Sequence, residues 1–100
     1  MIPTPGRIVA YKLTSYDAEA INIERRAENT SRFGNSVAAG DIYPLVITRV
    51  WSQLPGGAVN GQVLLDGNDS IWVTSRTLMA DEETSDPAMG YWAPFPRVEG

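Results

Sequence analysis

Apolar side chains recur with a period of two in four stretches of the chain, which is the spacing of β-strands with a buried face. We expect strands at residues 6–13, 42–51, 62–65 and 70–76. In the stretch 42–51 both alternating faces are apolar, so other parts of the protein are expected to cover each of them. Pro44 cannot donate a backbone hydrogen bond, which indicates an edge position or a bulge near the start of this strand.

One segment has the signals of a helix instead. Thr14 is followed three residues later by Asp17, and this pair can cap the first turn of a helix over residues 15–28. A narrow apolar stripe places such a helix at the rim of a sheet rather than through a core. The stripe is expected to carry Ala18, Ile21 and Arg25.

The last two of the four strands are joined by Asp66, Gly67, Asn68 and Asp69. An Asp-Gly pair between apolar runs predicts a hairpin, because glycine accepts the positive φ of a tight turn. The same residues begin like a calcium-binding loop, but Thr77 stands where that loop needs a bidentate glutamate. We interpret the segment as a turn whose Asx side chains bond their own backbone.

One strand, a helix and then three strands with short connections predict a mainly β domain with one helix. In a chain of 100 residues, this order favours a small SH3-like antiparallel barrel, with an OB-like barrel as the alternative. A barrel pairs the strand edges that these short strands would otherwise leave open.

The remaining segments lack regular periodicity. Residues 29–41 are rich in Asn, Ser and Gly and are expected to form a connecting loop, whereas the acidic residues 79–90 are expected to form a mobile loop. The end of the chain, about residues 87–100, holds aromatics among prolines, so we expect an extended tail pinned against the barrel or a partner. No internal repeat or linker divides the chain, so residues 1–100 are expected to form one domain.

Composition excludes several kinds of chemistry. The chain has no cysteine and no histidine, which removes disulfides, thiolates, the usual zinc ligands and the commonest proton-transfer group. The formal net charge is −4 and the basic residues are scattered, so nucleic acid is an unexpected partner. No apolar run approaches the roughly 20 residues of a membrane span, and the N-terminus lacks the apolar segment of a signal peptide. We therefore expect no cofactor, no metal, no membrane partner and no secretion by a signal peptide.

Two further sets of residues were candidates for catalysis. Carboxylates in the run of acidic residues can act as a catalytic pair or contact a basic partner, but a solvated loop does not shift their pKa values. The hydroxyl groups of residues 70–75 have no histidine to activate them. We therefore expect a protein that is not an enzyme and has no small-molecule substrate. The acidic run comprises Asp81, Glu82, Glu83 and Asp86.

The aromatic residues carry more information about contacts. They belong either to the core or to a surface that binds a partner, since tryptophan and tyrosine are favoured at interfaces. On the last of the four strands, Ile71 and Val73 alternate with Trp72, so an inward aliphatic pair makes Trp72 face outward, toward the tail or another subunit. The candidate partner-binding residues are Trp51, Trp72, Tyr91, Trp92 and Phe95.

Four stretches together resemble a family of small, uncharacterised proteins encoded by tailed bacteriophages of actinobacteria. They are "IPTPGRIVAYKLTSYDAEAIN", "GNSVAAGDIYPLVITRVW", "VNGQVLLDGNDSIWVTS" and "YWAPFPRV". The similarity covers most of the chain and departs mainly at residues 80–90. It implies a phage protein, and it implies no catalytic or ligand-binding residues.

From the resemblance and the lack of reactive side chains, we expect a non-enzymatic structural protein of the virion. Its role would be capsid decoration or cement, or head–tail or tail assembly, through contacts with other phage structural proteins or with its own copies. The alternative is an early-expressed phage protein that binds and redirects a host factor, with an acidic surface that mimics nucleic acid or contacts a basic patch. Both would be synthesised in the cytoplasm of the bacterial host.

Overall fold

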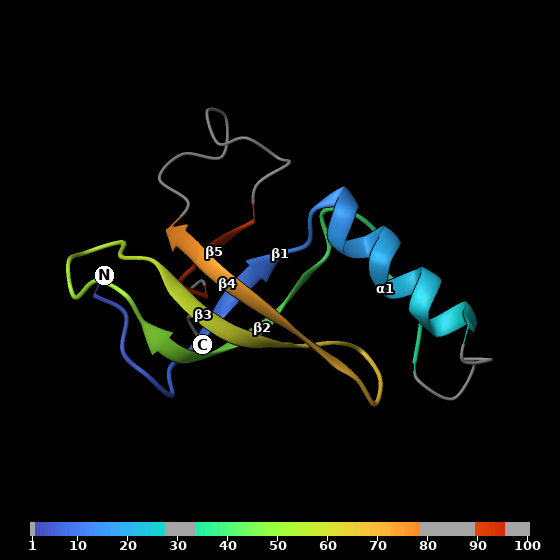
Figure 1. Ribbon diagram of the computed structural model, residues 1–100, viewed down its shortest axis with the longest axis horizontal. Helices are drawn as coiled ribbons and strands as arrows, with labels where there is room; N and C mark the ends of the chain where they lie inside the picture. The colour runs from blue at the N-terminus through green and yellow to red at the C-terminus, as the bar shows by residue number, and fades with distance from the viewer. Residues whose placement is uncertain (1, 28–33, 79–89, 96–100) are drawn as a thin grey trace, which may run out of the picture.

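The computed structural model describes residues 2–27, 34–78 and 90–95. Five strands form a barrel, and the helix lies at the end of the barrel away from the N-terminus (Figure 1). In chain order the elements are β1 Ile8–Lys12, α1 Ser15–Ala27, β2 Ile42–Val50, β3 Val59–Leu64, β4 Ser70–Leu78 and β5 Tyr91–Ala93. No helix in these described ranges has the length and apolarity needed to cross a bilayer.

The barrel is closed, and its strands are neighbours in chain order. β1 to β4 pair successively as antiparallel strands, β5 returns antiparallel to β1, and β4 and β5 run parallel. The expected mainly β fold with one helix and a barrel is therefore confirmed, but a wholly antiparallel barrel is wrong. Strand direction alternates around an antiparallel ring, so a closed ring with an odd number of strands must contain a parallel pair.

The barrel interior is filled by the alternate side chains of every strand. The helix adds Ala18 and Ile21 to this core, and Arg25 on the same side is also buried, as the sequence predicts. Val73 of β4 is also buried, and the largest fully buried side chains on strands come from β1, β2, β3 and β5, so the core joins the whole ring. These largest side chains are Trp92, Tyr11, Leu45, Ile47, Val9, Val59 and Val63.

The tail contains a strand that the sequence pattern did not predict. Tyr91–Ala93 form β5, in which Trp92 pairs with Tyr11 on one side and with Leu78 on the other. The indole Nε1 of Trp92 donates to the carbonyl oxygen of Gly57 at 3.2 Å, which satisfies the one polar atom of a fully buried ring. The expected mobile loop lies outside the described residues, except for Gly90.

The start of α1 has the predicted capping box. The Thr14 hydroxyl accepts from the Asp17 backbone N–H at 3.0 Å, and the Thr14 backbone N–H donates to Asp17 Oδ2 at 3.0 Å. The Tyr11 hydroxyl also donates to Asp17 Oδ2, at 2.7 Å. Asp17 therefore fixes both the first turn of the helix and its position relative to β1.

Two bulges meet at Asn60 in the middle of β3. The register of β2 against β3 shifts between Ile47 and Arg49, and β4 places two residues opposite Asn60 on the other side. The bulge expected near the start of β2 therefore lies farther along that strand. Pro44 instead pairs with β1 beyond the end of the β2–β3 ladder, where its missing N–H costs no bond to β3.

The buried amide oxygen of Asn60 accepts three hydrogen bonds. The donors are the indole Nε1 of Trp51 at 2.8 Å, the hydroxyl of Thr74 at 2.8 Å and the backbone N–H of Ser75 at 2.9 Å. Ser75 has a φ of 57°, a left-handed conformation that side chains other than glycine rarely adopt. The bond from its N–H to Asn60 offsets part of the cost of this conformation.

We predict that Asn60→Ala lowers the free energy of unfolding by about 1–3 kcal/mol, because it removes the buried acceptor of three part-buried hydrogen bonds. Urea denaturation of the purified protein measures the change. The matched control is Gln62→Ala, which removes only an exposed hydrogen bond from Ser70 and is expected to change stability by less than about 0.5 kcal/mol. Equal effects of the two substitutions would contradict the role given to Asn60.

Candidate functional site

The outside of the barrel carries apolar side chains at neighbouring positions on adjacent strands. Ile8 pairs with Val46, Val46 with Gln62, and Gln62 with Trp72, which forms one row across β1 to β4. Ile8 is 55% exposed and Trp72 is 58% exposed, so the ends of the row are open to solvent. Leu64, two residues from Gln62 on the same face of β3, is also exposed.

We call this surface the outer apolar face: its apolar members are Ile8, Val46, Leu64 and Trp72, and the polar side chain of Gln62 lies between Val46 and Trp72. It exists because the inward residues of the same strands complete the core, and strict alternation then turns their neighbours outward. A large exposed tryptophan among aliphatic side chains is typical of a surface that another molecule covers. The strand pairing that buries the core therefore also fixes the positions of these outward side chains.

The five aromatic residues proposed for partner binding are distributed differently. Trp72, Trp51 and Phe95 are exposed, and Tyr91 is half-buried. Trp92 is a correction to the sequence analysis: it is fully buried in the barrel, so its ring is part of the core and is closed to a partner. In the described part of the tail, the ring of Trp92 therefore holds β5 in place. This part of the tail does not cover Trp72, which stays exposed.

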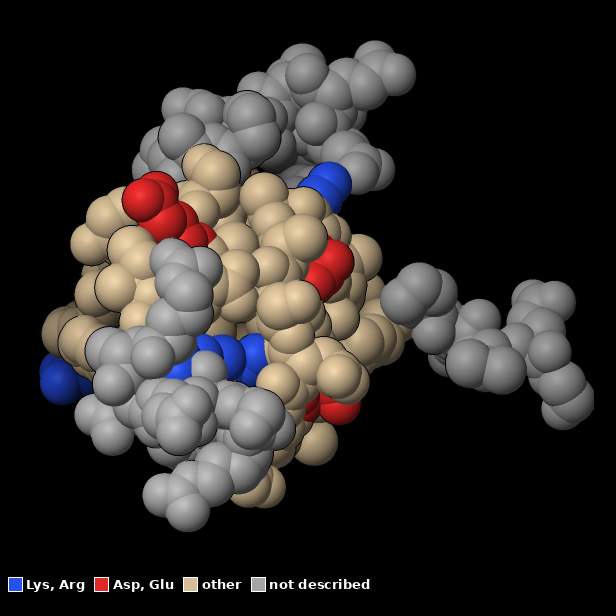
Figure 2. Space-filling model, turned by 90° about the vertical axis from the view of Figure 1, so that its right-hand side faces the viewer, with Lys and Arg blue, Asp and Glu red and all other residues tan. Residues whose placement is uncertain are grey.

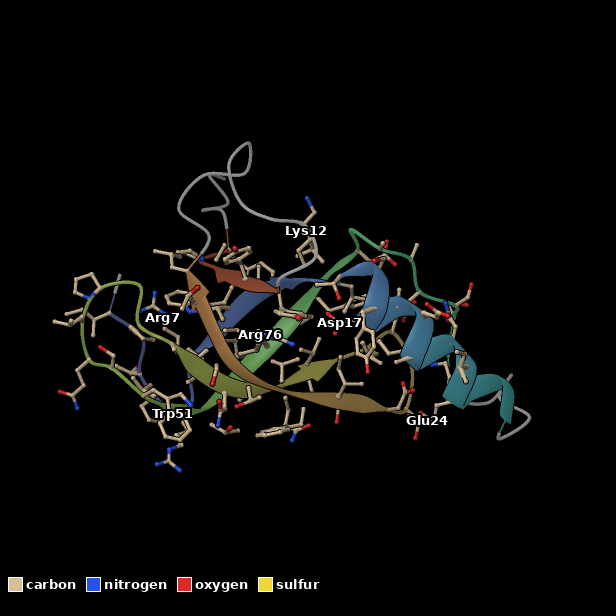
Figure 3. All side chains as sticks on the ribbon, turned by 45° about the horizontal axis from the view of Figure 1, so that its top comes forward. Arg7, Lys12, Asp17, Glu24, Trp51 and Arg76 are labelled. Carbon is tan, nitrogen blue, oxygen red and sulfur yellow. The ribbon has the colours of Figure 1, made fainter. Side chains whose placement is uncertain are left out.

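Trp51 is an exposed ring held in one orientation. Its indole nitrogen bonds Asn60, and the guanidinium of Arg49 lies over the ring at 3.8 Å from the ring centroid. The side chain is 51% exposed although both of these contacts restrict it. Trp51 and Arg49 thus form a fixed aromatic and cationic pair at the end of β2, close to the N-terminal segment (Figure 3).

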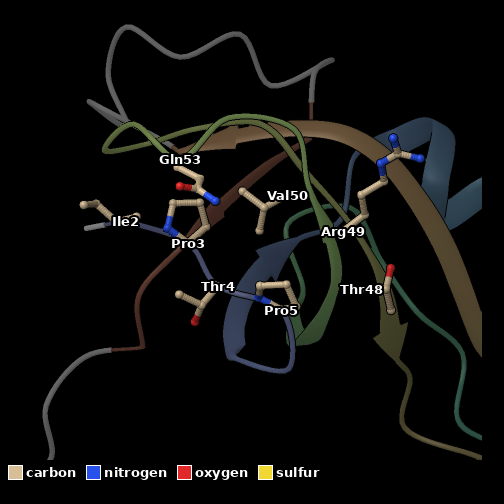
Figure 4. A pocket seen from close by; sticks show the side chains of 8 residues that line it. All are labelled: Ile2, Pro3, Thr4, Pro5, Thr48, Arg49, Val50 and Gln53. Carbon is tan, nitrogen blue, oxygen red and sulfur yellow. The ribbon is translucent and has the colours of Figure 1, made fainter.

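A groove that the sequence did not reveal lies next to this pair. The backbone N–H of Gly6 donates to the Ile47 carbonyl at 2.7 Å, and the Ile47 N–H donates to the Arg7 carbonyl at 2.9 Å, which holds the N-terminal segment beside β2. Between them is a cavity of about 570 Å³ (Figure 4). Its lining residues are Ile2, Pro3, Thr4, Pro5, Thr48, Arg49, Val50 and Gln53.

The loop between β3 and β4 turns the chain, as predicted, but it also anchors the helix. Arg25 donates to both carboxylate oxygens of Asp69, from Nε at 2.9 Å and from NH2 at 2.7 Å. Asn35 donates through its side-chain amide to Asp66 Oδ2 at 2.7 Å. The interpretation that these Asx side chains bond their own backbone holds for Asp69, which also receives its own backbone N–H, but it omits the bonds of Asp69 to Arg25 and of Asp66 to Asn35. The carboxylates of Asp66 and Asp69 therefore hold the loop against the helix and the segment at Asn35.

Gly67 is needed in this loop for a different physical reason from the predicted one. Gly67 does not have a positive φ; instead it forms a bridge with Gly34, whose chain crosses close to the loop. A Cβ on Gly34 would overlap the Asp66 carbonyl oxygen and the backbone of Gly67. The paired glycines therefore allow two backbone segments to approach, which brings Asn35 and Asp66 together.

A second polar cluster lies at the start of α1, where Tyr11 and Asp17 meet with Arg76 of β4 nearby (Figure 3). Burial raises the pKa of Tyr11 far above its ordinary value, the hydrogen bond to Asp17 raises it further, and Arg76 opposes both effects. Tyr11 therefore stays protonated and acts as a hydrogen-bond donor. The Nε atom of Arg76 is buried without a hydrogen-bond partner.

The described side chains offer little for metal or acid–base chemistry. Within residues 2–27, 34–78 and 90–95 no group of three carboxylates is arranged to hold a metal ion. The face at the α1 end shows basic and acidic side chains in small separate groups among uncharged ones (Figure 2). The acidic run at residues 81–86 lies outside the described residues.

No family model matches this chain, and no curated protein or solved structure matches it either. The fold and the surfaces described above are therefore the basis for inferring its function. The outer apolar face and the groove beside Trp51 are two of the described surfaces with exposed contact area.

We predict that Asp69→Asn destabilises the protein by about 1–3 kcal/mol at pH 7, because it weakens the bonds of a buried guanidinium. The hydrogen bonds from Arg25 lower the pKa of Asp69 from its ordinary value, so the folded state holds this proton less tightly than the unfolded chain does. The ion pair therefore contributes fully above about pH 4, and its contribution is lost as the pH falls through the lowered pKa.

Urea unfolding of the wild-type protein and the variant at pH 7, 5 and 3 tests this prediction. The difference between the two proteins is expected to be similar at pH 7 and 5 and to shrink at pH 3. Asp66→Asn, which keeps an oxygen that can accept from Asn35 in an exposed position, is the matched control with a smaller effect. A difference that stays constant down to pH 3 would contradict the assigned ion pair.

Proposed function

We propose that this protein is a non-enzymatic structural component of a bacteriophage virion, which acts in capsid decoration or in head–tail or tail assembly through protein contacts. The observation that carries the proposal is the outer apolar face, where the exposed Trp72 of β4 lies diagonally opposite the exposed Leu64 of β3. The resemblance of the sequence to small phage proteins supplies the biological setting.

The energetics of this face favour a macromolecular partner. A tryptophan side chain can bury about 150–250 Å² in a contact, and apolar burial contributes roughly 25 cal/mol per Å². Trp72 together with Ile8 and Leu64 therefore offers several kcal/mol before the costs of association are subtracted. Because the barrel already holds these side chains on paired strands, little backbone order has to be gained on binding.

The hydrogen bonds that the buried polar side chains make within the fold also support a non-enzymatic role. Asp17 caps α1 and accepts from Tyr11, and Asp69 is bonded at both oxygens by Arg25. The raised pKa of Tyr11 makes its hydroxyl a poor base and a poor nucleophile at neutral pH. These groups thus hold the helix and the barrel together.

We also propose that the barrel is of the SH3-like type rather than the OB-like type. The support is the strand order, in which each strand neighbours the next one in the sequence and β5 returns to β1. An OB-like barrel has Greek-key connections, in which a strand lies beside one that is not next to it in the chain. Successive hairpins from β2 to β4 fit the first arrangement.

Mass spectrometry of purified particles of the encoding phage tests the proposed function. Peptides of this chain are expected in a constant ratio to the major capsid or tail protein. Their absence from particles, with the protein present in infected cells, would overturn the proposal and favour a host-directed role.

We predict that Trp72→Ala reduces incorporation of the protein into particles by roughly tenfold or more, since a tryptophan buried in an interface contributes a large part of the interface energy. Quantitative peptide counts from purified particles measure the change. Trp72→Phe keeps an aromatic surface and is expected to retain most incorporation. Because Trp72 is exposed, thermal unfolding of both variants should match the wild type. Normal incorporation of Trp72→Ala would exclude the outer apolar face as the contact.

A further inference from the structure

The two ends of the barrel differ in the exposed charges that the structure describes. Arg7 and Arg49 are exposed at the end that holds the N-terminal segment and Trp51. Glu19 and Glu24 are exposed on α1 at the opposite end. Figure 3 places Arg7 and Trp51 at one end of the molecule and Glu24 at the other.

The helix presents an apolar stripe between these glutamates. Tyr16, Ala20 and Ile23 recur at intervals of four and three residues, so they share one side of α1. All three are exposed, and Tyr16 is 78% exposed, because the opposite side of the helix packs on the core. By the helical angle, Glu19 and Glu24 lie on either side of this stripe. We call it the helix ridge: Tyr16, Ala20 and Ile23 with flanking Glu19 and Glu24.

The groove at the other end has apolar lining residues and arginines nearby, whereas the helix ridge has glutamates. Its lining includes the exposed Ile2 and Pro5 and the half-buried Val50, whereas Pro3 is fully buried beneath them, and Arg49 also lines it (Figure 4). Arg7 stands two residues after Pro5, the last lining residue of the N-terminal segment, and the hydrogen bonds of this segment to Ile47 hold it in place. We call it the basic groove. Its volume of about 570 Å³ accommodates a few side chains of a ridge rather than a whole helix.

We propose that the helix ridge of one copy docks into the basic groove of a second copy, so that copies of this chain associate end to end. An apolar ridge with carboxylates at its margins is complementary in charge to a groove at the end of the barrel that carries the exposed Arg7 and Arg49. The two surfaces lie at opposite ends of one chain, so the contact is heterologous and leaves a free ridge and a free groove on every pair. Such contacts close into rings or extend into filaments.

This inference rests on the proposed function as a structural protein, and it names the partner as the chain itself. The net charge of −4 opposes close approach of two copies, so the local attraction between ridge and groove must overcome a general repulsion. Exposed charges are screened by salt. The association is therefore expected at high protein concentration and to weaken as the salt concentration rises.

Sedimentation velocity of the full chain at increasing concentration tests the proposal. The wild type is expected to form species larger than the monomer. Arg7→Glu/Arg49→Glu and Glu19→Arg/Glu24→Arg, each alone, are expected to weaken association by roughly tenfold or more, because each places like charges across the contact. An equimolar mixture of the two variants is expected to recover association, since reversed grooves then meet reversed ridges and native grooves meet native ridges.

Tyr16→Ala provides a test without any change of charge. It removes the largest exposed side chain of the ridge, so it should weaken association by roughly tenfold while circular dichroism shows an unchanged fold. A wild type that stays monomeric up to millimolar concentration would overturn the proposal, as would reversed variants that associate like the wild type or fail to recover when mixed. These results leave the virion measurement untouched, so self-association and the proposed function can fail separately.

Discussion

The closure of an odd number of strands is the constraint on which this structure depends. Five strands in one ring require one parallel pair, and here β4 and β5 form it. Parallel neighbours cannot be joined by a tight hairpin, so the chain needs the long connection after β4 before it can return. The closing strand has only three residues, and the full burial of Trp92 between β1 and β4 gives it the packing that so short a strand lacks by itself.

Asn60 links the curvature of the barrel to the exposed surface. Bulges in the strands on both sides bend the sheet at this residue, and bulges increase local twist, which helps a five-strand sheet to close. The same amide oxygen that satisfies the left-handed Ser75 also holds the indole of Trp51. An internal hydrogen bond therefore fixes the orientation of a tryptophan at the surface, beside the groove.

The sequence predicted the features that depend on near neighbours. The capping of α1 by Thr14 and Asp17 spans three residues, and the alternation in β1 to β4 is visible within each strand. The bond between Arg25 and Asp69 joins residues 44 apart, and nothing local to either residue indicates the other. β5 escaped prediction for the same reason, because three residues between prolines become a strand only by pairing with β1 and β4.

The candidate surfaces also differ in whether they depend on residues near one another in the sequence or far apart. Trp72 was identified as outward-facing because alternation with Ile71 and Val73 decides the side on which it lies. The groove could not be identified, since its two walls come from the N-terminal segment and from the end of β2. Trp92 was wrongly predicted to bind a partner, because the local sequence around an aromatic residue in a tail is the same whether its ring packs in the core or contacts another protein. Asn60, Asp17 and Asp69 bond within the fold, whereas Trp72 and Trp51 leave aromatic area exposed, and that exposed area is the basis of the proposed contacts.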